Sequence, residues 1–158
     1  MEQDFNSYLL SLGKLYGNFH SLEFALRAYL YSRDPTIPFE HGVDLGQLKV
    51  GQDVPLNAFT NFDSLGKLIS KFNVYMAEHR PSEIIDSTIV DLRDALAHGR
   101  VSGATSALPL RLLTFSAPKR DAVRVTWSEE LSPTWLDQQR LRVFNELMKV
   151  LRNLGPPA

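Results

Sequence analysis

The chain has 158 residues, of which 44% are hydrophobic and 22% charged, with 9 Gly and 9 Pro. This composition excludes disordered, collagen-like and low-complexity proteins, and the length favours a single domain over residues 1–158. The absence of Cys excludes disulfides, thiolate nucleophiles and Cys-based zinc sites. The net charge is −1, but residues 1–92 carry 7 Lys and Arg against 12 Asp and Glu, and residues 93–158 carry 10 against 6. The second part, with a net charge of +4, can therefore form a local basic surface.

A long amphipathic helix is predicted over about residues 5–33. Apolar and aromatic side chains follow a heptad pattern at Phe5, Tyr8, Leu12, Leu15, Phe19, Leu22, Leu26 and Tyr29. Asp4 can cap the start of this helix, and Asp34 before Pro35 favours its end. A second apolar face comprises Leu9, Tyr16, Phe24 and Leu30. Either contacts within the chain or a homodimer interface would cover this face.

Two further helices are predicted after an ordered loop insertion at residues 34–62, which is rich in Pro and Gly. The second helix spans about 64–79, with Thr60 or Asp63 as its cap. The third spans about 83–98, after a turn at Pro81, and Gly99 can serve as its C′ residue.

The apolar period then changes from 3.6 to 2, which predicts a β-hairpin at residues 108–128 after a flexible segment at 102–106. Ser132 and Pro133 have the residue types of an N-cap and a first helical position, so a last helix is predicted over about 133–153. The expected fold is mainly α, with about four helices in a bundle and one β-hairpin between the last two. No apolar run could span a bilayer, and the acidic start differs from a signal peptide. We therefore expect a cytoplasmic protein without membrane contact.

The densest polar cluster lies at the end of the third predicted helix, in Asp91-Leu92-Arg93-Asp94-Ala95-Leu96-Ala97-His98-Gly99-Arg100. Asp94 and His98 are four residues apart, so the carboxylate can accept a hydrogen bond from one ring nitrogen and leave the other nitrogen free. This arrangement is typical of general acid/base chemistry.

The segment Arg93-Asp94-Ala95-Leu96-Ala97-His98 resembles the R-polar-x-x-x-H motif of HEPN domains, which are helical domains of prokaryotic defence and toxin–antitoxin systems and of several eukaryotic RNases. The resemblance covers residues 5–33 and 63–100. It implies an antiparallel helical bundle and a metal-independent endoribonuclease without cofactor, with a composite active site at a homodimer cleft. It also implies an RNA substrate and an antitoxin or other protein partner.

Carried over from the resemblance, His98 is the acid/base and Arg93 binds the scissile phosphate. Asp94, at a position where Asn is the commoner choice, would orient His98 or the phosphate, and Glu23 is a supporting candidate. Five residues turn an ideal helix through about 500°, which leaves Arg93 and His98 about 140° apart. The two therefore meet only if the helix unwinds at His98 or if two protomers share the site.

Other interpretations of these residues stay open. The cluster can be an ordinary helix end where Arg93 pairs with Asp86 or Asp91. The domain can also be a non-catalytic HEPN-like interaction module that binds a partner protein or nucleotide, so whether the chain is an enzyme is left undecided.

The basic residues of the second part are candidates for RNA binding. They are Arg100 after the third helix and Lys119, Arg120 and Arg124 around the hairpin turn, with Trp127 as a stacking group. The alternative is that the turn residues are only solvated and that Trp127 is core. The pair His20 and Glu23, and the set Asp91, Asp94 and His98, lack the further ligands of a metal site, so no metal is expected.

Overall fold

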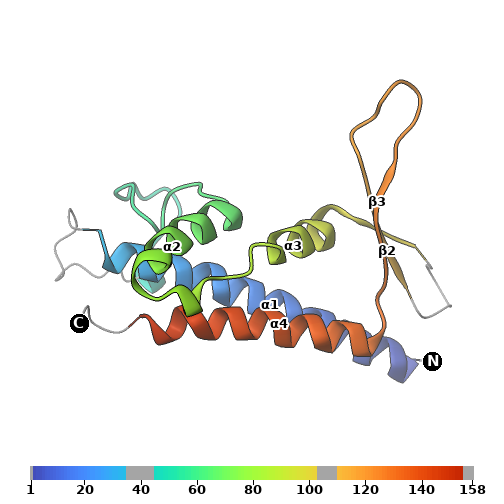
Figure 1. The fold of residues 1–158 in the computed structure, drawn as a ribbon, viewed down its shortest axis with the longest axis horizontal. Helices are drawn as coiled ribbons and strands as arrows, with labels where there is room; N and C mark the ends of the chain where they lie inside the picture. Colours follow the sequence, from blue (N-terminus) through green and yellow to red (C-terminus); the bar gives the residue numbers. More distant parts are fainter. Residues whose placement is uncertain (1, 35–44, 103–109, 155–158) are drawn as a thin grey trace. The chain divides into compact units, whose positions relative to one another are not determined.

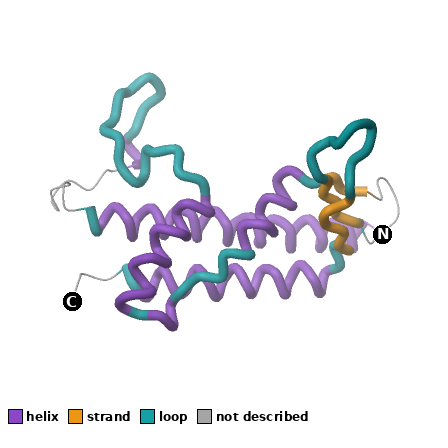
Figure 2. Tube along the Cα trace, turned by 45° about the horizontal axis from the view of Figure 1, so that its top comes forward, coloured by secondary structure: helices purple, strands orange, loops and turns teal. Residues whose placement is uncertain are grey.

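A computed structural model describes residues 2–34, 45–102 and 110–154 of the chain. Its elements in chain order (Figure 1) are α1 (Glu2–Ser32), the 3-10 turn η1 (Leu45–Gln47), α2 (Leu65–His79), the 3-10 turn η2 (Pro81–Glu83), α3 (Ile89–His98), β1 (Arg100–Ser102), β2 (Arg111–Phe115), β3 (Val125–Glu130) and α4 (Pro133–Arg152). The protein is therefore mainly helical with a small sheet, as Figure 2 shows. The expected helical class is confirmed.

The chain divides into two compact units. One comprises Met1–His20 and Asp86–Glu146, and the other Ser21–Ile85 and Leu147–Ala158. Helices α1 and α4 each supply a segment to both units.

The core of the first unit is formed by side chains from α1, α3, the sheet and α4. Its buried apolar residues are Tyr8, Leu15, Phe19, Ile89, Leu92, Ala95, Leu112, Leu131, Leu136 and Val143. Asn18 Nδ2 of α1 donates to the carbonyl oxygen of Arg140 of α4 at 3.0 Å. Within this unit α1 and α4 run in the same direction (Figures 1 and 2), whereas antiparallel neighbours were expected. The returning helix α3 and the sheet supply the crossover that a parallel pair of helices requires.

The sheet has three antiparallel strands in the order β1-β2-β3, one more than the predicted hairpin. The additional strand β1 pairs Arg100 with Leu113 and Ser102 with Arg111. Between β2 and β3 the register pairs Thr114 with Trp127 and Phe115 with Val125, which leaves Thr126 as a bulge residue. Strands β2 and β3 form an antiparallel hairpin, and an isolated bridge joins Lys119 to Ala122 near its tip. The segment 103–109, which includes most of the predicted flexible stretch and the predicted start of the hairpin, lies outside the described residues.

Helix α3 begins at Ile89, six residues later than predicted. The Asp86 carboxylate accepts hydrogen bonds from the Thr88 N–H at 3.0 Å and the Thr88 hydroxyl at 2.7 Å. Such local bonds offer the backbone an alternative to the helix. The predicted start at 83 is instead the short turn η2. At the other end of α3, Gly99 has φ −69° and ψ 167°, so the helix stops in an extended residue and not in the left-handed conformation of a C′ glycine.

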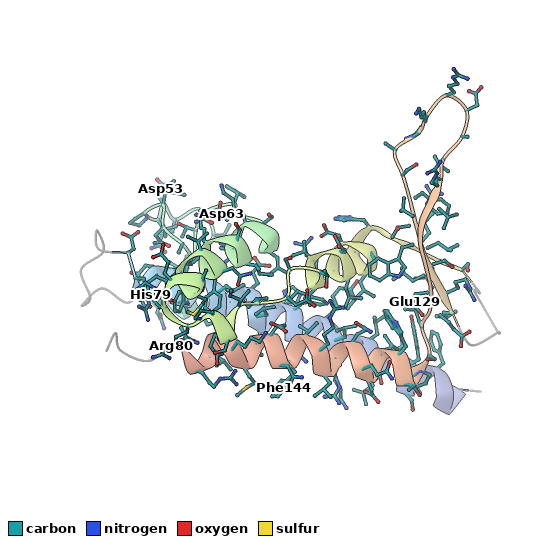
Figure 3. The ribbon with its side chains drawn as sticks, viewed as in Figure 1. Asp53, Asp63, His79, Arg80, Glu129 and Phe144 are labelled. Atoms are coloured by element: carbon teal, nitrogen blue, oxygen red, sulfur yellow. The ribbon has the colours of Figure 1, made fainter. Side chains whose placement is uncertain are left out.

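The second unit packs α2 against the later part of α1 and the end of α4. Its buried apolar side chains are Leu22, Ala25, Leu26, Tyr29, Leu65, Leu68, Ile69, Phe72, Met76, Ile85, Leu147 and Val150. Ser64 caps α2 by accepting from the Lys67 N–H, in place of the predicted Thr60 or Asp63. The Asp63 carboxylate pairs instead with Lys67 Nζ at 2.8 Å and Lys71 Nζ at 2.6 Å. Figure 3 labels Asp63 beside α2.

One arginine anchors the loop before α2. The Arg27 guanidinium donates to the carbonyl oxygens of Ala58, Asn61 and Asp63, at distances between 2.8 and 3.3 Å. It also donates to Asn61 Oδ1 at 3.0 Å and to Glu23 Oε1 at 2.9 Å. Of the predicted loop insertion, the described part 45–62 is held in turns, and residues 35–44 lie outside the described residues.

The predicted ends of α4 and the predicted seam of α1 are largely confirmed. The Trp135 N–H donates to Ser132 Oγ at 3.2 Å, and Pro133 is the first helical residue. Six of the eight seam positions of α1 are buried, whereas Phe5 is 46% exposed and Leu12 is half-buried. Helix α1 begins at Glu2 and not after Asp4.

Candidate functional site

A hollow of about 470 Å³ lies in the first unit, between one face of α3 and the sheet. Helix α3 contributes Asp91, Asp94, Ala95 and His98, in which Asp91 and His98 each lie three or four residues from Asp94 and Ala95, so the four share one helix face. Strands β2 and β3 contribute Thr114, Phe115, Thr126 and Trp127. The hollow therefore combines an imidazole, two carboxylates, two hydroxyls and two aromatic rings.

A bulge in β3 lies beside this hollow. Successive residues of a regular strand point to opposite faces of a sheet. Thr126, the bulge residue, and its neighbour Trp127 both line the hollow, as do the neighbours Thr114 and Phe115 of β2. The hydroxyls of Thr126 and Thr114 lie 2.8 Å apart across the two strands. Bulges often re-aim side chains beside functional sites.

His98 is the last residue of α3, and its side chain is exposed at the hollow. No described residue hydrogen-bonds its ring, so the predicted bond from His98 to Asp94 is absent. Helical structure continues through His98, which excludes the local unwinding that would bring Arg93 to it within one chain.

Gly99 fixes where His98 lies. A Cβ atom at Gly99 would stand 2.6 Å from Leu112 Cδ1 and would collide with the carbonyl oxygen of Ala95. The end of α3 therefore packs directly on β2 because residue 99 has no side chain. The Gly99 N–H donates to that same Ala95 carbonyl at 2.7 Å.

Arg93 does not line the hollow. Its Nη1 atom donates to Asp94 Oδ1 at 2.7 Å, and the two side chains are 32% and 52% exposed. The predicted partners Asp86 and Asp91 do not hold it. Asp94 therefore pairs with Arg93 and also lines the hollow that contains His98.

Arg100 is brought to the rim of the hollow by β1. Its guanidinium carbon lies 5.2 Å from the ring centroid of Phe115, which is a cation–π distance. Phe115, Thr114 and Thr126 were not predicted as site residues. The alternating pattern places Phe115 in a strand, but only the register of the folded sheet shows that its ring faces α3.

The hairpin cations Lys119, Arg120 and Arg124 are exposed at and near the tip. Arg120 has φ +58°, a left-handed conformation that suits a tight turn. Trp127 is half-buried and lines the hollow, so it is not the fully buried core residue of the alternative interpretation.

Glu23, the supporting candidate, belongs to the second unit. Its carboxylate forms an ion pair with Arg27 at 2.9 Å, and Arg27 in turn anchors the loop before α2. This contact gives Glu23 a structural role.

A hydrogen-bond network holds the segment just before the start of α3. Arg142 Nη2 of α4 donates to Asp86 Oδ2 at 2.7 Å and also contacts the Thr88 hydroxyl. The Asp86 N–H donates to Glu146 Oε2 at 3.2 Å. Hydrogen bonds from Thr88, together with Arg142, lower the pKa of Asp86 from 3.8 to about 2. The charged carboxylate thereby ties the N-terminal end of α3 to α4.

Comparisons of the chain with protein-family models, with curated proteins and with solved structures find no match. Within residues 2–34, 45–102 and 110–154, no group of three or more His, Asp or Glu side chains is arranged to hold a metal ion. No helix of these described ranges combines the length and apolar content needed to cross a membrane.

Proposed function

We propose that the chain is a metal-independent endoribonuclease of the HEPN type, with a composite active site at a homodimer cleft. One observation carries the proposal: the exposed His98 ring, free of hydrogen bonds to described residues, lies in a hollow with aromatic walls and with Arg93 and Arg100 nearby. Such a hollow suits a nucleotide, because a base can stack on an aromatic ring while the imidazole reaches its sugar. In this proposal the protein acts as a toxin or as a defence effector.

The proposed reaction is an internal transesterification of RNA. His98 accepts the proton of the 2′-hydroxyl, and the 2′-oxygen attacks the adjacent phosphorus. The bond from phosphorus to the 5′-oxygen breaks, the leaving oxygen takes up a proton from water, and His98 returns its proton to water. The products are a 2′,3′-cyclic phosphate and a 5′-hydroxyl. Arg93 stabilises the charge that develops on the phosphate through its planar pair of donors.

The proposed dimer brings Arg93 of one protomer to His98 of its partner, because Arg93 lies off the His98 face of its own helix. Exposed apolar side chains support an interface. In the first unit, Phe5, Leu9 and Leu10 of α1 are 46%, 47% and 59% exposed. Nothing described lies within 4 Å of a Cβ atom built on Gly13 or Gly17, so this part of α1 leaves room for close approach of a second copy.

A second candidate function is a non-catalytic HEPN-like module that binds a partner protein or nucleotide. The ion pair between Arg93 and Asp94 favours it, because this pair occupies the cation that would hold the phosphate. Asp91 and Asp94 also add negative charge to the hollow. Binding of RNA or nucleotide without cleavage would identify this module.

The test is cleavage of mixed RNA by the purified full chain in EDTA. We expect cleavage to continue, DNA to resist, and end-group analysis to show cyclic phosphates. His98→Ala should lower the rate by about 10²- to 10⁴-fold, as loss of a positioned acid/base does. His20→Ala, which changes an exposed His of α1 outside the hollow, is the matched control and should cleave like the wild type. Undiminished cleavage by His98→Ala, or cleavage that EDTA abolishes, would falsify the proposal.

A further inference from the structure

A second hollow, of about 800 Å³, lies on the β2–β3 hairpin. Lys119 and Arg124 are among the residues that line it. Thr126 lines both this hollow and the His98 hollow, so the two adjoin along β3. Figure 1 shows the hairpin extending beyond the end of α3 as a projecting arm. A ligand can therefore pass from the arm to His98 without crossing the core.

The arm carries positive charge that no described carboxylate neutralises. Residues 116–124 contain Lys119, Arg120 and Arg124 against the single acid Asp121. None of the three cations forms an ion pair with a described residue. Unpaired cations beside an open hollow are suited to phosphate groups, since each contact releases a condensed counterion.

The bulge connects the charged arm to the aromatic wall. Along a strand, the path from Arg124 to Trp127 is about 10 Å at roughly 3.3 Å per residue. Over this distance the lining changes from cations to the Thr126 hydroxyl and then to the half-buried Trp127 ring and His98. This order matches a nucleic-acid strand whose backbone contacts the cations while one base stacks on Trp127.

We propose that the hairpin is the substrate-binding arm of the molecule and that single-stranded RNA lies along β3, with phosphates at Lys119 and Arg124 and a base on Trp127 beside His98. This inference rests on the proposed ribonuclease function and names its substrate class. A duplex is disfavoured because its bases are already stacked and paired, so none is available to the Trp127 ring.

Fluorescence anisotropy with a labelled RNA oligonucleotide tests the arm. The full chain carrying His98→Ala keeps the RNA intact during the measurement. We expect the single strand to bind at least 10-fold more tightly than the same strand annealed to its complement. Lys119→Ala/Arg124→Ala should weaken binding at least 10-fold and reduce the slope of log K against log[salt] by about 1.4, or about 0.7 per lost phosphate contact.

The matched control is Lys14→Ala/Arg140→Ala, which removes the same charge from α1 and α4 of the same unit. It should change affinity and slope far less. Trp127→Leu should weaken binding by about 5- to 100-fold, whereas Trp127→Phe, which retains a stacking ring, should bind like the wild type. Thermal unfolding of each variant shows whether the fold is retained. Because Trp127→Phe should keep both the fold and a stacking ring, it tests stacking even if Trp127→Leu fails to fold.

The arm inference is overturned if the hairpin variant binds like the control variant or if duplex RNA binds more tightly. It is also overturned if sedimentation shows that the hairpin variant has lost a dimer that the control retains, because the arm would then be an interface between copies. If the wild type cleaves RNA and the hairpin variant binds and cleaves RNA equally well, the arm inference alone is refuted. RNA that binds through the arm and is never cut would refute the ribonuclease proposal and leave the arm.

Discussion

Arg93 Nη1 lies 2.7 Å from Asp94 Oδ1, so the cation of the proposed site is held by the residue that follows it in the chain. Phosphate would have to compete with this carboxylate for the guanidinium. Because both side chains are partly exposed, the pair contributes no more than about 1 kcal/mol. The ion pair can therefore open when RNA binds, and a weaker ion pair should give a higher affinity for RNA.

Asp94→Asn should release Arg93 and lower the KM for RNA by about 2- to 5-fold, which is the effect of losing an exposed ion pair. Steady-state cleavage of a labelled RNA measures it. Asp91→Asn removes an equal charge from the same hollow without touching Arg93. An equal gain in both variants would show that the effect is one of charge in the hollow and not of the pair with Arg93.

Mixing two inactive proteins tests whether the site is shared between chains. Arg93→Ala and His98→Ala each remove one half of the composite site. Random exchange makes half of the dimers mixed, and each mixed dimer has one intact site, so about a quarter of the wild-type activity should return. Activity that stays at the level of the separate variants, although sedimentation shows mixed dimers, would exclude a site built from two chains.

Core and site residues of α3 should differ in their effect on stability. Leu92 is fully buried, so Leu92→Ala should lower the free energy of unfolding by about 2 to 5 kcal/mol. His98 is exposed, and no described residue hydrogen-bonds its ring, so His98→Ala should cost less than about 1 kcal/mol. Urea denaturation followed by circular dichroism measures both. A His98→Ala protein that unfolds would make His98 a structural residue.

Gly99→Ala should damage the site through the backbone. The added methyl group would press on Leu112 and on the Ala95 carbonyl, and crowding of this kind typically costs about 1 to 3 kcal/mol. We expect a lower melting temperature and weaker cleavage, since His98 must move with the helix end. Ala97→Ser, at an exposed position of the same helix outside the hollow, is the control and should change the melting temperature little.

The stability of the first unit should depend on pH through Asp86. Its folded pKa of about 2 lies below the ordinary value of 3.8, so the charged form is the one that folding favours. The stabilisation is complete above about pH 4 and is lost as the pH falls through 2. Asp86→Asn should be less stable than the wild type at pH 7 and should show a smaller loss of stability between pH 4 and 2. Equal pH dependence of the two proteins would exclude this role for Asp86.

The heptad pattern was sufficient to predict α1, because Leu15, Leu22 and Leu26 are fully buried as their spacing indicates. The same reasoning placed the start of α3 too early. Ile85 fits the apolar stripe of that helix and is buried, but it lies in the irregular segment between η2 and the helix. Periodicity reports burial and does not distinguish a helix from a tightly packed turn.

The candidate site was predicted in part. Arg93, Asp94 and His98 were identified from one short segment, whereas the aromatic wall depends on how β2 and β3 pair. Strand β1 is three residues long and exposed, so its sequence carries no alternating pattern. The bulge at Thr126 likewise has no local signature, because it is fixed by the register against Thr114 and Phe115. The pairing of β1, β2 and β3 joins residues that are distant in sequence, so local sequence patterns do not predict it.

The anchoring of the loop before α2 has a consequence for how that loop can vary during evolution. Three of the groups that Arg27 binds are main-chain carbonyls, at Ala58, Asn61 and Asp63. Every residue type presents the same carbonyl group, so these three bonds recognise the path of the chain, whereas the bond to Asn61 Oδ1 also recognises one side chain. Substitutions at Ala58 that preserve this path should be neutral. Selection on this anchor should therefore act on Arg27, outside the loop, and on Asn61 within it.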